Sequence, residues 1–594
     1  MCPDLRGTLS PPVKGHAAKK DIPMLFAAVS FLGEITNTFF IRTMMSLTSP
    51  ENFSCDVLVI GGGGAGLRAA IEAKERGVDV IVVSKSRVGY GNNTFISKGT
   101  FAAATGWQDS KDSPDVHMKD SIIGGRFIND QRLVKTMTKE AADQIAFLEK
   151  CGVNFFKRQG NIRLTHTPGH SYSRHVRGEH QTGSDFTLPL GEYANRIGIR
   201  FAEKIFITKI FTLRDRIAAA TGITQDGRFL TFVATCMILT TGGFAQAYLH
   251  NNNAAGMTGD GQALAFELGI PLRDMEFVQF YPTSLGALGR RLFLYEAFVF
   301  QAGAVIRNAQ GDDIIAKYGL KGSMAMTRDR LTRAIMREIL EGRDLDGGVI
   351  IELKTVPEEK LNKLRHLLPT VDQPNKKEFI VSPTAHFCMG GIIIDENAET
   401  SIPGLFAAGE VCAGIHGANR LGGNALTEVF TIGGIAGRMA AIKAGEIGRP
   451  DFPTTQVAEE KTRLESLLTS GNRDARGLRK DLKQLMWDKA GIIRNKSGLQ
   501  EAVRRIKELT ADLPRVQVRD GGGLIKYLEL YNMLLLSEMV CRAALLRTES
   551  RGAHYRIDYP GENNKNWLKN ILIYKQDSDI RLDAVKVSMG PVSP

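Results

Sequence analysis

Apolar residues and glycines near the start of the chain follow a strand–turn–helix–strand pattern. The apolar run 56–60 predicts a strand, four glycines follow it, and the stretch 67–76 has the composition and spacing of a helix. A second apolar run, 78–83, comes directly after Gly77. Together these elements predict a βαβ unit of about thirty residues.

Two later segments repeat the order of strand and then glycine. The run 229–239 is rich in β-forming residues and leads into Thr240–Gly243, while 404–410 is a short apolar strand that ends in glycine and glutamate. Strands that return late to an early nucleotide-binding unit indicate a domain built from separated pieces. The stretch between them, from about 256 to 370, is therefore predicted to be an inserted domain.

From about residue 453 the pattern becomes helical. Glycine thins, and leucine recurs with lysine, arginine and glutamate at helical spacing through 477–489, 497–511 and 524–546. This pattern predicts a helical domain over residues 453–546. The tail, 547–594, has a mixed pattern, and we expect it to wrap the other domains.

The first fifty residues carry a different signal. Met24–Gly33 is an apolar run of ten residues that follows two lysines, and it is too short to span a bilayer. It is either a secretory signal or untranslated sequence ahead of a start at Met44 or Met45. Because no small-x-small cleavage site follows clearly, we favour the later start and expect residues 1–50 to be an extension. No other segment has a transmembrane pattern.

Composition narrows the class of protein. The chain has 594 residues with 43% hydrophobic and 24% charged content, as in a globular protein of two to four domains. Its net charge of +12 either steers anionic ligands or reflects a generally basic surface. No aromatic-studded basic stripe indicates nucleic acid. The seven cysteines contain no Cys-x-x-Cys pair, so we expect no metal site, no iron–sulfur cluster in this chain and a reducing, cytoplasmic location.

The clearest chemical motif is Gly61-x-Gly63-x-x-Gly66, placed between the predicted strand and helix. Its glycines permit a tight turn and close approach of backbone to a pyrophosphate, and the helix N-terminus supplies N–H groups. The next strand ends in Ser84-Lys85, where a standard NAD site has an acidic residue. One extended cofactor touched by several segments, such as FAD, fits better. The further candidate segments are Thr240–Gly243, Thr258–Asp260 and Gly409-Glu410.

Longer motifs then occur in a fixed order along the chain. They are Met275–Gln279, Thr327–Asp329, Ala385–Gly391, His416–Leu426 and Glu549–His554. Over about residues 54–575 the chain resembles the flavoprotein subunit of fumarate reductase and succinate dehydrogenase, in the family that also holds L-aspartate oxidase. The resemblance implies an α/β fold: a Rossmann-like FAD-binding domain (51–255 and 371–445), an inserted α+β capping domain (256–370) and the C-terminal helical domain (453–546).

The resemblance also implies how the flavin is held. In succinate-linked members a histidine within Ser-His-Thr attaches the flavin covalently, and Asn93 stands at that place here. Asparagine cannot form this bond, so we expect non-covalent FAD. The expected cofactor contacts are Gly61, Gly63, Gly64, Ala65, Gly66, Ser84, Lys85, Asn93, Thr94, Gly99, Gly242, Asp260, Glu410, Ala425 and Leu426.

In the resembling family a cap arginine donates and accepts the substrate proton, and Arg328 matches it. The free pKa of arginine lies far above neutrality, so this role requires desolvation and neighbouring charge. Without the resemblance, Arg328 would be read as an ion-pair partner of Asp329 or Glu338 at the start of a helix. Glu296 matches a glutamate that passes protons toward the arginine.

His386 and Arg420 match the pair that grips one substrate carboxylate, for which a guanidinium offers a planar fork of donors. The second carboxylate site departs from the family. Tyr281 replaces a histidine and Tyr295 a threonine, so two phenols would hold the second carboxylate, and more weakly. Alternatively, one of the arginines at 290 and 291 fills that gap. Val299 replaces an arginine of the proton relay.

These features predict a FAD-dependent oxidoreductase that interconverts a carboxylate-activated C=C and C–C bond. An amino-acid oxidase of the L-aspartate type is one alternative, and a flavin electron-transfer subunit without its own organic substrate is another. We expect a small carboxylate substrate, and we expect the electron-transfer partner to be a separate iron–sulfur subunit. Any membrane association would come through that partner.

Overall fold

The structure is a computed structural model that describes residues 47–285, 294–364, 377–577 and 579–594. The predictions for the N-terminal extension up to residue 46, including the start at Met44 or Met45, lie outside the described residues. So do Arg290 and Arg291, the alternative anchors for a second carboxylate.

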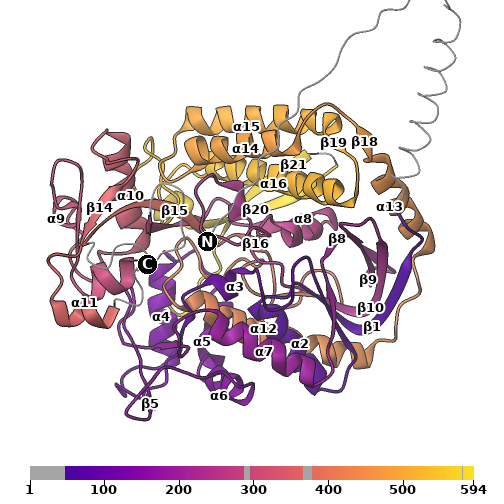
Figure 1. Cartoon of the computed structure of the whole chain (residues 1–594), viewed down its shortest axis with the longest axis horizontal. Coiled ribbons are helices and arrows are strands. Elements are labelled where there is room, and N and C mark those ends of the chain that lie inside the picture. Colours follow the sequence, from indigo (N-terminus) through magenta and orange to yellow (C-terminus); the bar gives the residue numbers. More distant parts are fainter. Residues whose placement is uncertain (1–46, 286–293, 365–376, 578) are drawn as a thin grey trace, which may run out of the picture. The chain divides into compact units, whose positions relative to one another are not determined.

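A seven-stranded sheet forms the centre of the flavin domain (Figure 1). Its first strand pairs in parallel with both β2 and β10, and Val57–Ile60 is buried because helices cover both faces. The predicted βαβ unit is confirmed, since α2 (Gly64–Glu75) connects β1 to β2. The strands are β1 (Glu51–Ile60), β2 (Val80–Ser84), β7 (Arg200–Glu203), β8 (Ile205–Leu213), β9 (Arg216–Thr224), β10 (Phe229–Leu239) and β17 (Leu405–Ala407).

The long helix α12 (Asn424–Glu446) packs against α2. A side chain at Gly437 would place its Cβ 2.2 Å from the carbonyl oxygen of Ala69, so only glycine allows this approach. By length and apolar composition α12 is the one helix among the described residues that could cross a membrane, but its apolar stretch is 78% buried. It is a core helix of the flavin domain.

The capping domain has a four-stranded antiparallel sheet in the order β12-β15-β14-β13, with α10 (Arg328–Leu340) packed on β12. Its own apolar core includes residues from Tyr281 to Val381. This sheet runs from Val278 to Cys388, and the domain limits at 256 and 370 stay a prediction. The strands are β12 (Val278–Leu285), β13 (Val305–Arg307), β14 (Val349–Glu352) and β15 (Glu378–Cys388).

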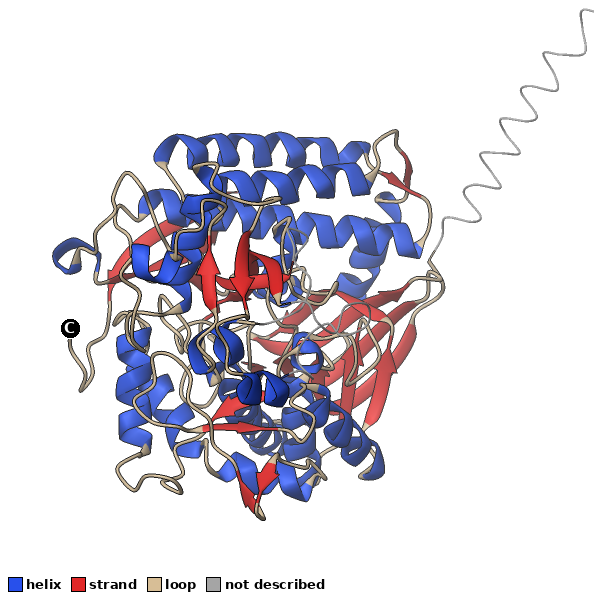
Figure 2. Cartoon of the chain, turned by 60° about the vertical axis from the view of Figure 1, so that its left-hand side comes forward, coloured by secondary structure: helices blue, strands red, loops and turns tan. Residues whose placement is uncertain are grey.

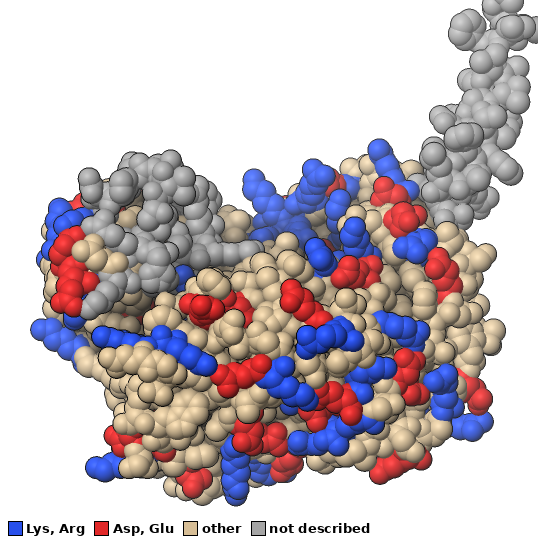
Figure 3. Space-filling model, turned by 60° about the horizontal axis from the view of Figure 1, so that its bottom comes forward, with Lys and Arg blue, Asp and Glu red and all other residues tan. Residues whose placement is uncertain are grey.

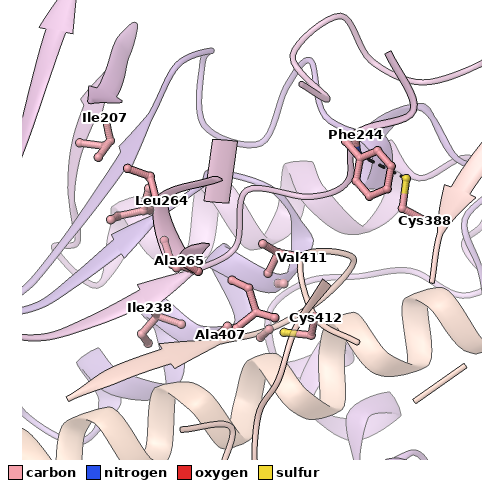
Figure 4. Close-up of a cluster of buried hydrophobic side chains, with 14 of the residues drawn as sticks. Ile207, Ile238, Phe244, Leu264, Ala265, Cys388, Ala407, Val411 and Cys412 are labelled. Carbon is pink, nitrogen blue, oxygen red and sulfur yellow. Dashed lines mark hydrogen bonds between the residues drawn. The ribbon is translucent and has the colours of Figure 1, made fainter. Parts of the chain in front are cut away.

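Helix α8 (Asp260–Glu267) packs against the central sheet of the flavin domain. Leu264 and Ala265 of α8 lie in the main core, with Ile207 and Ile238 of that sheet (Figure 4). The backbone N–H of Phe244 meets the thiol of Cys388 at 3.4 Å near the same core.

Four helices occupy much of the segment predicted to be helical, residues 453–546, and Figure 2 shows a layer of long helices along the top of the molecule. Aspartate or asparagine caps three of its helices, as when the side chain of Asp520 accepts a hydrogen bond from the N–H of Gly523 at 2.7 Å. The helices are α13 (Thr454–Ser466), α14 (Ala475–Ala490), α15 (Lys496–Asp512) and α16 (Gly521–Leu546).

The tail returns to the flavin domain. Its strands β20 (Lys569–Gln576) and β21 (Asp579–Lys586) form a hairpin, and β20 pairs with β11 (Leu272–Arg273). Nearby, fully buried Arg547 donates to Glu276 at 2.7 Å and to Glu549 at 3.0 Å. Burying a charge is costly unless it is paired, so these ion pairs fix the tail to the segment that leads into the cap.

The surface drawn in Figure 3 carries both signs of charge. Basic and acidic side chains intermingle over most of this face, and a group of basic side chains gathers near its upper edge. This face is therefore mixed in charge, and its described residues form no single continuous basic surface.

Candidate active site

A cavity of about 1000 Å³ runs from the glycine-rich turn after β1 to the start of α10 in the cap. This volume is at the upper end of the range for ligand pockets. Residues of the flavin domain, the cap and the helical domain all line it. The cavity therefore brings the predicted cofactor segments and the predicted catalytic residues to one continuous space.

The glycine motif forms a cradle at one end of this cavity. A Cβ at Gly66 would lie 1.9 Å from the carbonyl oxygen of Gly61, so the turn requires glycine there. A Cβ at Gly63 would meet nothing closer than Asn92 at 3.6 Å and would occupy the cavity itself. The open space in front of Gly63 and the N-terminus of α2 fit the pyrophosphate of FAD.

Most predicted cofactor contacts line the cavity, but Gly66 and Gly99 do not. Gly66 serves the turn, as described above. Gly99 has a φ of +55°, and a Cβ there would lie 2.1 Å from the carbonyl oxygen of Thr182. At both positions the close packing of the backbone requires glycine, and their role as cofactor contacts stays a prediction. The remaining thirteen predicted contacts line the cavity.

Lys85 and Asp260 also hold two domains together. The ammonium of Lys85 lies 2.6 Å from Asp260 and 3.0 Å from Glu529 of α16 in the helical domain. Thr258 accepts a further hydrogen bond from Lys85 at 2.8 Å. The cationic charge of Lys85 is thus already neutralised where it borders the cavity.

Asn93 lies at the middle of the cavity with its amide fully engaged. It donates to Asn253 at 2.6 Å and to Glu410 at 2.9 Å, and it accepts from the N–H of Ala254 at 3.0 Å. Burial raises the pKa of Glu410 to about 7. The amide thus has a structural role, in place of the histidine that links flavin in succinate-linked members of the family that the sequence resembles.

We therefore expect acid precipitation of the purified yellow protein to release all of its FAD, because Asn93 offers no nucleophile to the flavin. The measurement compares flavin absorbance in the supernatant with that in the washed pellet. The same treatment of a protein with covalently bound flavin is the control. Flavin that stayed with the pelleted chain would contradict the prediction.

Arg328 begins α10 and points its guanidinium into the cavity. It makes a close ion pair with Glu296, with Nε 3.1 Å from the carboxylate, and its Nη1 donates to Gln279 at 3.2 Å. The two partners considered from local sequence are wrong, because Asp329 pairs with Arg333 at 3.3 Å and Glu338 with Arg343 at 2.6 Å. Arg328 is paired with a residue 32 positions away.

The charges of this pair determine its protonation. Burial lowers the pKa of Arg328, but the Glu296 carboxylate together with Tyr281 and Tyr295 outweighs burial, and the net pKa is raised. Burial raises the pKa of Glu296, yet Arg328 and the Tyr281 hydroxyl together lower it below its ordinary value. Without substrate, Arg328 is therefore cationic and Glu296 is an anion.

Arg420 and His386 line the cavity near Arg328. Nη2 of Arg420 donates to Gln279 at 3.0 Å, whereas its buried Nε has no hydrogen-bond partner in the described part of the chain. Burial and the nearby Arg328 charge lower the pKa of Arg420 to about 9. His386 Nδ1 lies 3.0 Å from the Asn252 side chain, which fixes its ring, and burial lowers the pKa of His386 well below its usual value.

Both tyrosine hydroxyls have protein partners. Tyr281 donates to Glu296, and its ring lies 5.1 Å from the Arg328 guanidinium. Tyr295 donates to the carbonyl oxygen of Met326. A phenol has one proton to donate, so neither hydroxyl can serve a substrate carboxylate without losing its partner. Val299 is buried in the core of the cap.

Sequence reasoning missed several residues of the site. Gln279 is fully buried and accepts hydrogen bonds from both Arg328 and Arg420, which holds the two guanidinium groups in a fixed relation. Its place in the motif Met275–Gln279 was the available signal. Lys98 and Arg177 also line the cavity, and no local signal marks them.

Comparison with known proteins agrees with this arrangement. The family model described as FAD binding domain matches residues 56–426. The family model described as fumarate reductase flavoprotein C-term matches residues 479–594. The first match contains the glycine cradle, the cap and the Arg420 segment, and the second covers most of the helical domain and the tail.

Individual proteins match over nearly the whole chain. A fumarate reductase (CoM/CoB) subunit from Methanothermobacter marburgensis is 37% identical over 540 residues, which are 89% of this chain and 98% of that protein. Among solved structures, a mutant E. coli quinol fumarate reductase FrdA has a TM-score of 0.85 and 28% identity, covering 92% of this chain and 98% of its own. Mycobacterium smegmatis Sdh1 in complex with UQ1 has a TM-score of 0.81 and 34% identity, covering 92% and 96%.

Proposed function

The chain belongs to the family of fumarate reductase and succinate dehydrogenase flavoprotein subunits, and we propose that it transfers a hydride between FAD and a carboxylate-activated carbon–carbon bond. The observation that carries the proposal is one cavity that joins the glycine cradle to Arg328, His386 and Arg420. When bound, FAD supplies the hydride chemistry. The chain supplies substrate binding, orientation and the proton.

Arg420 and His386 are proposed to bind the first substrate carboxylate. Two hydrogen bonds hold the guanidinium of Arg420, one from Nη2 to Gln279 and one from Nη1 to the carbonyl oxygen of Leu421 at 3.2 Å. Its Nε lacks a partner among the described residues, so a donor is available for a ligand. A carboxylate so held orients the double bond and has its charge stabilised by the guanidinium.

Arg328 is proposed to give the proton to the substrate carbon opposite the hydride. Its raised pKa means that only a strongly basic acceptor can take the proton, and a carbon next to a carboxylate becomes such an acceptor as hydride arrives. Glu296, within hydrogen-bonding distance of Arg328, is placed to return a proton. Tyr281 holds Glu296 by a hydrogen bond and is a positioning residue in this scheme.

The same residues weigh against the two alternatives. A flavin carrier without its own substrate would not need Arg328, Gln279 and Arg420 arranged around one cavity. The relatives are named as fumarate reductase and succinate dehydrogenase subunits, and the amino-acid oxidase alternative is not favoured.

We further propose that the chain works as the flavoprotein subunit of a larger enzyme and passes electrons to a separate iron–sulfur subunit. The relatives' names support this, since they describe subunits of fumarate reductase or succinate dehydrogenase. Any membrane attachment would then lie in a partner, because α12, the apolar helix of the described chain, is a core helix.

A reduced-dye assay tests the proposed reaction. We expect the holoenzyme to oxidise a reduced one-electron dye when fumarate is added, because the cavity offers a carboxylate clamp and a proton donor. Substituted fumarates, aryl acrylates and iminoaspartate are compared in the same assay, with buffer alone as the control. If none of the enoates oxidised the dye while L-aspartate reduced the flavin, the oxidase alternative would replace this proposal.

A further inference from the structure

Positive charge exceeds negative charge at the cap end of the cavity. The side chains of Lys98, Arg177, Arg328 and Arg420 all line it, whereas Glu296 is the carboxylate paired with Arg328. The other carboxylate nearby, Glu410, has a pKa of about 7 and is only partly ionised at neutral pH. Because a buried charge is stabilised by an opposite charge, an acidic group of a ligand would be favoured at this end of the cavity.

A two-stranded antiparallel sheet, the β3–β6 pair, brings the backbones of two of these cations close together. Strand β3 (Thr100–Ala102) pairs with β6 (His175–Arg177), and Thr100 is the register partner of Arg177. Lys98 lies two residues before Thr100, so both cations lie at the same end of the β3–β6 pair. His386 belongs to β15, and Arg420 precedes α12.

Arg177 has unused hydrogen-bonding capacity. Its Nη1 donates to Gln181 at 2.9 Å, and its buried Nε has no hydrogen-bond partner in the described part of the chain. Burial lowers the pKa of Arg177, and the charge of Glu296 opposes that effect. Burial also lowers the pKa of Lys98, and the charge of Glu296 again opposes that effect. Both cations therefore lie within the electrostatic reach of the catalytic carboxylate.

The hydroxyls of Tyr281 and Tyr295 already have other partners, so the second anion site needs other donors. Tyr281 and Tyr295 occupy the positions at which the sequence predicted the second anion site, but their hydroxyl protons go to Glu296 and to the carbonyl oxygen of Met326. Replacing an anion-binding histidine by a phenol at position 281 removes a cation, whereas Lys98 and Arg177 of the β3–β6 pair supply two. Positive charge for a second acidic group is thus present among the residues that line the cavity.

We propose that Lys98 and Arg177 bind the second acidic group of a dianionic substrate whose first carboxylate Arg420 and His386 hold. This inference rests on the proposed function and assigns the specificity of that site. In this proposal the substrate is an unsaturated acid with negative charge at both ends. The β3–β6 pair is then the element that selects for the second charge. Arg177 would bind through its Nε and Nη donors, and Lys98 as a point charge.

The test compares fumarate with its monomethyl ester, which has the same double bond but only one charge. The variants are Arg177→Gln, Lys98→Gln and the charge-conserving Arg177→Lys. Arg158→Gln, at an exposed position of β4 (Lys157–Arg158), is the matched control. Flavin absorbance measured before each assay shows that every variant retains its fold and cofactor.

We expect Arg177→Gln and Lys98→Gln to raise KM for fumarate at least about 10-fold, because hydrogen bonds to charged groups are lost. Uniform binding of ground state and transition state would leave kcat nearly unchanged. KM for the monomethyl ester should stay within about twofold of wild type in these variants, because the ester has no second negative charge for Lys98 and Arg177 to bind. Arg177→Lys should recover most of the affinity for fumarate, and Arg158→Gln should behave as wild type.

A second readout does not depend on turnover. Malonate has two carboxylates and no CH–CH bond to oxidise, so its binding can be followed by perturbation of the flavin spectrum. We expect its Kd to rise in Arg177→Gln and Lys98→Gln and to stay unchanged in Arg158→Gln. Equal rises in KM for fumarate and for its ester, or an unchanged malonate Kd, would overturn the assignment of Lys98 and Arg177, while fumarate reduction by the wild type would still stand. Failure of the wild type on every enoate of the reduced-dye assay would instead remove the proposed function.

Discussion

Arg328→Gln is expected to lower turnover by about 10²- to 10⁴-fold, the usual contribution of general acid–base assistance, while FAD stays bound. Arg328 lies at the cap end of the cavity, whereas the glycine cradle lies at the other end. The substitution removes the proton donor and leaves Glu296 without its cationic partner. Turnover should therefore fail for lack of a proton, even though substrate can still reach Arg420.

The measurement is steady-state dye oxidation with fumarate, together with the ratio of flavin to protein absorbance. Arg330→Gln is the matched control, because Arg330 lies on the same helix α10 but is exposed. Arg328→Lys should also be nearly inactive, since a lysine lacks the fork that spans Glu296 and Gln279. Near-normal rates in Arg328→Gln would show that another group supplies the proton.

Gly63→Val is expected to abolish FAD binding and leave the fold intact. In the structure a Cβ at this position has ordinary van der Waals contacts, the nearest being Asn92 at 3.6 Å, so the protein itself can accommodate a side chain. The added branches would instead fill the space in front of the N-terminus of α2, where the pyrophosphate approaches the backbone. The purified variant should be colourless.

Flavin content and thermal unfolding separate loss of cofactor from loss of fold. Gly445→Val is the control, because a Cβ at that exposed glycine of α12 meets nothing within 4 Å and lies far from the glycine motif in sequence. Gly66→Val should instead damage the fold, since its Cβ would collide with the carbonyl oxygen of Gly61. A yellow Gly63→Val protein with full flavin content would refute the cradle as the pyrophosphate site.

The features of this protein that depend on neighbours along the chain could be predicted from its sequence. The βαβ unit, the glycine cradle and the helical domain were all predicted, because strand, turn and helix patterns span only a few consecutive residues. The resemblance then identified Arg328, His386 and Arg420, and the structure brings all three to one cavity. Asn93 could likewise be read directly as the residue that replaces a flavin-linking histidine.

Which distant residues meet became clear only from the folded chain. The resemblance linked Glu296 to the proton path of Arg328, but only the folded chain shows that Glu296, and neither Asp329 nor Glu338, pairs with Arg328, because the cap folds a segment 32 residues away onto the start of α10. Lys98, just before β3, and Arg177 of β6 come close together along the backbone because β3 and β6 pair. Such pairings are set by long-range packing and strand register, for which a local pattern carries no signal.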